Sequence, residues 1–193
     1  MAGPAARPLA IAHTEASKGW GGQEIRILSE AAAFRARGHD VHLYAASGAR
    51  IVEEAPRFGV PVTPLPIGRK RPAGLAALAR AIARRPVDLV NAHSSTDAWL
   101  AALACRVLSL RGRVAPVLVR TRHVSVPVPN DAATRWLYRK ATSRVVTTGE
   151  RLREQLIRDN GLDPARVVSV PTGIDPRRFG GLARDAARAE LGL

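Results

Sequence analysis

The sequence has few aromatic residues, a single cysteine and no long apolar run. Only 4% of its 193 residues are aromatic, so a core has to be built from Val, Leu, Ile and Ala. The hydrophobic fraction of 46% is ordinary for a globular protein. No stretch approaches the ~20 apolar residues that cross a bilayer, and the first ten residues do not resemble a secretory signal. We therefore expect a globular, cytoplasmic protein.

Reactive and metal-binding patterns are equally scarce. Cys105 is the only cysteine, and its Ala- and Leu-rich surroundings favour a small core residue over a nucleophile. The five histidines are scattered, and neither CxxC nor HxxxH spacing occurs. A GxSxG nucleophile elbow is missing too. The sequence thus predicts neither a metal site nor a cofactor.

Acidic residues are few beside basic ones: 16 Asp and Glu face 30 Lys and Arg, which gives a net charge of +14. Such a field attracts nucleic acid, anionic lipid or phosphorylated substrates. A generally basic, solvated surface and a functional patch both stay open as interpretations. The few aromatics and the lack of a groove-reading or stacking motif argue against specific nucleic-acid recognition.

Six of the cations lie in residues 69–85, around a segment of helical period. A basic amphipathic helix can lie on an anionic membrane surface, so a peripheral contact with the inner face of the membrane is one interpretation. We prefer the other, a surface helix whose apolar stripe packs on a sheet. The cations are Arg69, Lys70, Arg71, Arg80, Arg84 and Arg85, and the stripe is Leu75, Leu78 and Ile82.

Short apolar runs rich in β-branched residues alternate with segments of helical period. This order predicts a Rossmann-like, doubly wound α/β domain with a mainly parallel sheet of about seven strands. Each run is nearly continuously apolar, as in strands buried on both faces. The predicted strands are 9–13, 41–45, 60–65, 87–92, 117–121, 145–148 and 167–170, and the helices are 23–37, 49–58, 72–84, 96–110, 131–142 and 150–159.

The last part of the chain differs from the rest. Pro171, Gly173 and Pro176 punctuate it, and no strand follows its final helical segment at 182–191. A doubly wound domain does not need this piece for its core. We therefore predict a domain at 1–171, and at 172–193 a linker and helix that lead to a further domain.

Ligands of open α/β sheets bind at the carboxyl ends of the strands. The loop TEASKGWGGQE follows the first strand and places Gly21 and Gly22 at a helix N-terminus, where backbone N–H groups attract an anion. The loop matches neither GxGxxG nor GxxxxGK[ST], which counts against a dinucleotide cofactor and a P-loop. A turn that merely needs glycine is the alternative.

The fourth and fifth strands end in polar residues on the same predicted rim. His93 ends the fourth, and a cap at Ser95 or Thr96 would explain the polar residues after it. Arg120, Arg122 and His123 lie at the end of the fifth strand, where a basic cluster suits a phosphate-bearing or acidic ligand. Arginines that are merely solvated remain the alternative.

Four motifs occur in order along the chain: GWGGQE with a GHDV turn, VNAHSSTDAW, VSVPTGIDPRRF and a closing RAELGL. Together they resemble the N-terminal domain of the family-4 glycosyltransferases, retaining enzymes of the GT-B fold. The resemblance covers the chain from Leu9 onward. It implies two Rossmann-like domains facing each other across a cleft, the absent C-terminal one binding most of a nucleotide sugar.

The resemblance also implies roles for single residues. Gly21 and Gly22 would face the donor diphosphate, and His93 would hydrogen-bond the donor sugar near the reacting centre. The acceptor pocket would contain Gln23, Glu24, Arg122 and His123, and the interdomain hinge would contain Thr172, Gly173 and Asp175.

The complete enzyme would transfer a sugar from a nucleotide sugar to a hydroxyl of a glycan, lipid or small molecule, with retention and without a metal. Bacterial cell-envelope polysaccharide or lipopolysaccharide synthesis would be its setting. The family's basic pair and spaced glutamates do not occur in this sequence, so we expect the chain alone to be inactive. A basic nucleic-acid-binding module and half of a GT-B nucleotide-sugar epimerase are the alternatives.

Overall fold

Seven parallel strands form one sheet in the order β3-β2-β1-β4-β5-β6-β7. The structure is a computed structural model that describes residues 7–173 and 183–192. The chain reverses its winding direction between β1 and β4, which is the doubly wound arrangement. The predicted fold class is confirmed. The strands are β1 (Ala10–Glu15), β2 (Asp40–Ala46), β3 (Val62–Leu65), β4 (Leu89–Ala92), β5 (Val117–Arg122), β6 (Arg144–Thr147) and β7 (Val167–Ser169).

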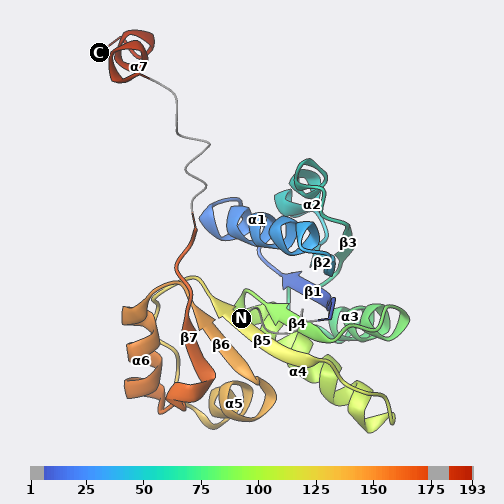
Figure 1. Ribbon diagram of the computed structural model, residues 1–193. Coiled ribbons are helices and arrows are strands. Elements are labelled where there is room, and N and C mark those ends of the chain that lie inside the picture. The colour runs from blue at the N-terminus through green and yellow to red at the C-terminus, as the bar shows by residue number, and fades with distance from the viewer. Residues whose placement is uncertain (1–6, 174–182, 193) are drawn as a thin grey trace.

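Helices cover both faces of the sheet (Figure 1). On one side lie α1 (Gly22–Ala36), α2 (Arg50–Glu54) and the 3₁₀ turn η1 (Ala55–Phe58). On the other lie α3 (Pro72–Arg84), α4 (Ser95–Leu110), α5 (Ala132–Trp136) and the π-helical turn η2 (Leu137–Ala141). Beside β7 are α6 (Glu150–Asn160) and η3 (Pro164–Arg166), and α7 (Arg184–Glu190) follows beyond the domain body.

Local sequence explains where the predicted helices change or end. The predicted helix 49–58 splits into α2 and η1, since Pro56 lacks an N–H and Gly59, with φ of 65°, terminates the turn. Gly38, with φ of 87°, follows α1, and the N–H of His39 donates to the Phe34 carbonyl at 3.1 Å. This is the glycine-dependent Schellman ending, and it turns the chain into β2.

The apolar stripe of α3 faces the core. Leu78 and Ile82 are buried and Leu75 packs against the same cluster, and α3 lies along α4. This outcome agrees with the preferred interpretation of the basic segment, a surface helix packed on the domain. A membrane contact through the basic face of α3 remains a prediction.

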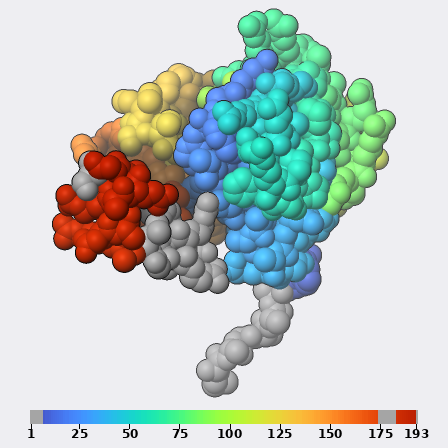
Figure 2. Space-filling view, turned by 90° about the horizontal axis from the view of Figure 1, so that it is seen from above, coloured from blue at the N-terminus to red at the C-terminus, as the bar shows by residue number. Residues whose placement is uncertain are grey.

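The expectation that every strand is buried on both faces is wrong for one side of the sheet. Val117 of β5 is 49% exposed and Val168 of β7 is 47% exposed. The reason is that α1 and α2 cover only the β1–β3 half of this face. Among the described residues, no helix covers these valines. Figure 2 shows α1 and α2, blue to cyan, on one part of this face and the yellow segment after β5 on another.

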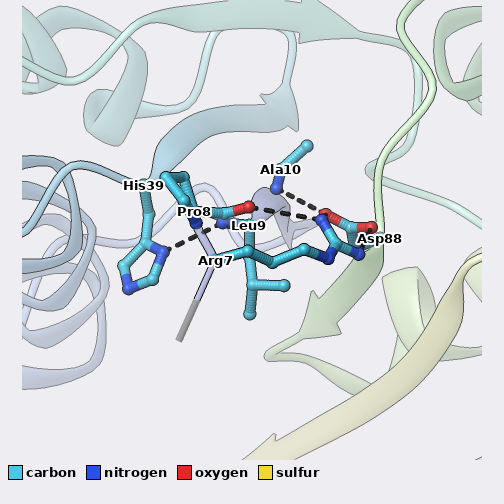
Figure 3. A network of polar contacts seen from close by, with 6 residues as sticks. All are labelled: Arg7, Pro8, Leu9, Ala10, His39 and Asp88. Atoms are coloured by element: carbon cyan, nitrogen blue, oxygen red, sulfur yellow. Dashed lines mark hydrogen bonds and ion pairs between the residues drawn. The ribbon is translucent and has the colours of Figure 1, made fainter. Parts of the chain in front are cut away.

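A polar network fixes the amino ends of β1 and β4 (Figure 3). The Arg7 guanidinium pairs with Asp88 at 2.6 Å, and the same carboxylate accepts from the Ala10 N–H at 2.8 Å. On the β2 side, the Leu9 N–H donates to His39 Nδ1 at 3.1 Å. These bonds hold β1 between its two neighbours and thereby align the carboxyl ends of the strands.

The close approach of α3 to the loop before it gives a first testable prediction. A Cβ on Gly74 would lie 2.7 Å from the Pro66 carbonyl oxygen. We expect Gly74→Ala to lower the free energy of unfolding by about 1–3 kcal/mol, as overpacking does, even though alanine favours helix. Urea denaturation followed by circular dichroism measures this change.

Gly22→Ala is the matched control, because no described atom lies within 4 Å of a Cβ there. We expect it to leave stability unchanged or to raise it. An equal loss in both variants would contradict the packing explanation.

Candidate functional site

The carboxyl ends of β1, β4 and β5 lie side by side at one edge of the sheet. Thr14 of β1 pairs with Ala92 of β4, which pairs in turn with Arg120 of β5. The His93 N–H extends the pairing by donating to the Thr14 carbonyl at 3.3 Å. The loops that carry Gly21, His93 and His123 therefore start from the same edge, as the sequence predicts.

Three histidines form a continuous row across this edge. His13 Nδ1 lies 2.8 Å from His93 Nε2, and His93 Nδ1 lies 3.0 Å from His123 Nε2. The ring centroids are 5.1 and 5.2 Å apart. We call His13, His93 and His123 the histidine row. Sequence reasoning missed His13, although a histidine inside an otherwise apolar strand was the available signal.

The histidine row is uncharged at neutral pH. Burial lowers the pKa of His13 to about 4. Burial, with the charge of Arg26 adding to it, lowers the pKa of His123 to about 4 as well. The pKa of His93 is well below its usual value because of burial first and then its two histidine neighbours and Arg26.

The N-terminus of α1 has no side-chain cap among the described residues. Gly21 is its N-cap, in extended conformation. A Cβ on Gly21 would have only Glu24 Oε2 nearby, at 3.8 Å. The first N–H groups of the helix thus keep their hydrogen-bonding capacity and the positive end of the helix dipole.

Glu15 has a buried carboxyl group beside this helix end, and sequence reasoning did not identify it. It accepts hydrogen bonds from the Ser17 N–H at 2.6 Å and from the Gln23 amide. Burial, with the nearby charge of Asp97, raises the pKa of Glu15 to about 8. Gln23, predicted for the acceptor pocket, is therefore engaged with Glu15, while Glu24 is buried in the first turn of α1.

Asp97 fixes the backbone around His93. Its carboxylate accepts from Thr14 Oγ1 at 2.7 Å, from the His93 N–H at 2.9 Å and from the Ser94 N–H at 2.8 Å. The N-cap of α4 is Ser94, which forms a capping box with Asp97. The predicted caps at Ser95 and Thr96 are wrong by one or two residues, because the helix starts as soon as β4 has ended.

The two arginines at the end of β5 are buried, so the interpretation that they are merely solvated is wrong. Arg122 donates to the Tyr138 hydroxyl at 3.2 Å and to the Val126 carbonyl, and the Arg120 guanidinium lies 4.9 Å from the Tyr138 ring centroid. Arg122 thus stabilises the segment after β5. Its predicted contact with an acceptor stays a prediction.

Arg26 of α1 is a further buried cation that the sequence did not single out. It donates to Thr172 Oγ1 and to the Val170 carbonyl, both at 2.8 Å, and so connects α1 to the chain leaving β7. Thr172 and Gly173, two of the predicted hinge residues, are exposed, and their role as a hinge stays a prediction. Asp175, the third predicted hinge residue, lies outside the described residues.

Other features of the described residues offer less chemistry. Cys105 is half-buried and lines a groove of about 480 Å³ between α4 and η2, and burial raises the pKa of its thiol to about 11. In residues 7–173 and 183–192, His, Cys, Asp and Glu side chains form no group of three or more that could hold a metal ion. None of the helices described there has the length and apolarity to cross a membrane.

Comparison with known proteins identifies the family. The model of Glycosyltransferase Family 4 matches residues 20–178, more than half of the chain. The chain belongs to glycosyltransferase family 4. The match includes Gly21, Gly22, His93 and His123. Among curated proteins, none matches this family-4 chain.

Solved structures share the fold of this family-4 domain at low identity. Anabaena Alr3699/HepE, in complex with UDP-glucose, is similar over 95% of this chain and 50% of its own, with a TM-score of 0.75 and 16% identity. A Rickettsia africae glycosyltransferase is similar over 97% of this chain and 50% of its own, with a TM-score of 0.75 and 16% identity. Acinetobacter baumannii MurG is similar over 88% of this chain and 48% of its own, with a TM-score of 0.60 and 15% identity. This family-4 chain therefore spans about half the length of these relatives.

The raised pKa of Glu15 predicts a pH dependence of stability. The folded protein keeps a proton on Glu15 up to about pH 8, whereas the unfolded chain loses it near pH 4.5. Stability therefore falls as the pH rises between these values, by up to about 1.4 kcal/mol per pH unit. Above pH 6.5 the three histidines of the row, whose folded pKa is lowered, no longer oppose this fall, so we expect a decline from pH 6.5 to 8.

Urea denaturation at several pH values measures the decline, and Glu15→Gln should flatten it. The exposed Glu53 on α2 provides the control Glu53→Gln, in which stability should still decline with pH as in the wild type. A wild-type stability that is flat or rising between pH 6.5 and 8 would contradict the assignment.

Proposed function

We propose that this family-4 domain is the acceptor-side half of a glycosyltransferase that moves a sugar from a nucleotide sugar to an acceptor hydroxyl, with retention of configuration. The acceptor class we propose is a glycan, a lipid or a small molecule. The observation that carries the proposal is the meeting of the uncapped α1 N-terminus, the histidine row and the buried Arg26 at one edge of the sheet.

Donor binding would use the backbone of Gly21 and Gly22. Open N–H groups at a helix N-terminus bind phosphate oxygens without needing a metal ion. Two cations lie near this end of the sheet: Arg50 stacks over Trp20 at 5.6 Å, and Lys18 lies close to Gly68. A UDP-sugar is the donor we propose, since Anabaena HepE binds UDP-glucose.

The acceptor would lie between the first turn of α1 and the end of β5, near Glu24 and His123. Its hydroxyl would attack the sugar from the face that the diphosphate leaves. A second domain would supply most of the groups that stabilise the charge developing on that diphosphate. We therefore expect the chain alone to bind ligands but not to transfer sugar.

The second domain would join through the hinge at Thr172, Gly173 and Asp175. Arg26 supports this proposal, because it holds Thr172 beside α1. The setting we propose is bacterial envelope glycan synthesis in the cytoplasm, with a peripheral membrane contact through the basic face of α3. The excess of positive charge supports it, since anionic lipid attracts such a surface.

A matched pair of glycine variants tests donor binding. Gly21 and Gly149 are both N-caps in extended conformation, of α1 and α6. We expect Gly21→Val to weaken UDP-glucose binding at least about tenfold, or about 1.4 kcal/mol, because its side chain blocks the approach of a phosphate. Gly149→Val should leave binding unchanged. Calorimetric titration measures both, and equal affinities would contradict the proposed phosphate site.

Sugar transfer itself is tested in a protein that contains this chain together with a donor-binding domain. We expect transfer to an acceptor hydroxyl with retained anomeric configuration, and a loss of orders of magnitude in His93→Ala. Near-normal turnover would remove His93 from the site. An isomerised sugar would indicate an epimerase, and oligonucleotide binding that persists at physiological salt would indicate a nucleic-acid-binding module.

A further inference from the structure

His93 has no free ring nitrogen while the histidine row is intact. Its Nε2 is bonded to His13 Nδ1 and its Nδ1 to His123 Nε2. A ligand that approached His93 directly would have to displace one of these neighbours. His93 itself is buried, whereas His123 is only half-buried. The end of the row that a ligand can reach is therefore His123.

Proton counting couples the tautomers of the three rings. Each neutral imidazole carries one N–H, and each of the two N···N hydrogen bonds needs one proton between its nitrogens. If the proton of His93 is on Nδ1, then His13 must donate from Nδ1, and His123 must carry its proton on Nδ1. If it is on Nε2, all three rings are protonated on Nε2. Mixed tautomers would break one of the two bonds.

The closed end of the row selects between these two states. His13 Nε2 is enclosed and has no hydrogen-bond partner among the described residues. A proton there would be a buried N–H without an acceptor, and such groups are rare in folded proteins. A bare nitrogen at this place is the less costly form. The closed end also gives a proton no exit, so the row cannot conduct a proton through the domain.

We propose that His13 and His93 are positioning residues that fix His123 as a neutral Nδ1–H donor at the accessible end of the row. His123 then donates a hydrogen bond to an oxygen of the bound nucleotide sugar, either a sugar hydroxyl or a phosphate oxygen, next to the proposed acceptor pocket, and does not act as a base. The choice of ligand rests on the proposed function. The tautomer of His123 is independent of the proposed function, because contacts within the domain determine it.

The nearby charge of Arg26 is consistent with this arrangement. Arg26 lies close enough to His93 and His123 to disfavour the imidazolium form of both. A fourth proton on the row would make one ring an imidazolium and place a second cation beside this guanidinium in a buried site. Burial and this guanidinium therefore keep the row neutral, which is the premise of the proton count.

Long-range ¹H–¹⁵N correlation spectra of the imidazole rings test the proposal directly on the full chain at pH 7. We expect His13, His93 and His123 all to be Nδ1–H tautomers, each favoured at least about tenfold over the alternative. The other two histidines, His39 and His42, give internal reference signals. An Nε2–H tautomer or an imidazolium at His123 would overturn the proposal.

Replacing His13, at the enclosed end of the row, should change the tautomer of His123 at the accessible end. In His13→Phe, His93 loses its donor, so the Nδ1–H preference of His123 should fall to a mixture of tautomers. The control is His42→Phe, since His42 of β2 bonds Thr63 at 2.8 Å outside the row. It should leave the His123 signal unchanged. An unaltered His123 tautomer in folded His13→Phe would overturn the coupling, and the wild-type spectrum tests the tautomer if this variant does not fold.

Titration with UDP-glucose, with UDP as the comparison probe, separates this inference from the proposed function. A shift of the His123 ring signals with UDP-glucose alone indicates a sugar oxygen, and a shift with both probes indicates a phosphate oxygen; either supports donation by His123. If all three rings are Nδ1–H tautomers but their signals respond to neither probe, the tautomer assignment stands and the hydrogen bond from His123 to the nucleotide sugar is contradicted.

Discussion

The pairing of β4 with β1 on one side and with β5 on the other is the constraint on which the site depends. Parallel strands end at the same edge, and the His93 N–H continues the ladder onto Thr14. Asp97 then binds β1, the β4–α4 turn and the first turn of α4 through one carboxylate. The histidine row can form only because these strands end in register.

Buried charge is concentrated at this edge and is incompletely neutralised within the domain. Burial raises the pKa of both Glu15 and Asp97, and the charge of Asp97 raises that of Glu15 further. The Arg120 guanidinium has nitrogens without partners among the described residues. Such groups lower the stability of a domain, and they cluster at binding and catalytic sites. Their gathering at the strand ends, and not in the apolar centre, agrees with a ligand site.

Helices cover the two halves of the sheet to different extents. The β1–β4 half is enclosed by helices on both faces, whereas valines of β5 and β7 reach solvent on one face. The relatives of similar fold are about twice as long as this chain. Arg26 of α1 holds the chain after β7 beside this helix.

Periodicity and turn residues in the sequence determined the seven strands and most helices, because apolar spacing, Gly38 and Pro56 act locally. The motifs determined the family, and the strand ends determined that Gly21, His93 and His123 share an edge. Only the tertiary structure decided that His13 joins them, that Arg122 turns toward Tyr138, and that Arg26 reaches Thr172 across 146 positions of sequence. Sequence spacing predicts which edge a residue lies at. Which side chains touch there depends on strand order and packing, and these are properties of the whole sheet.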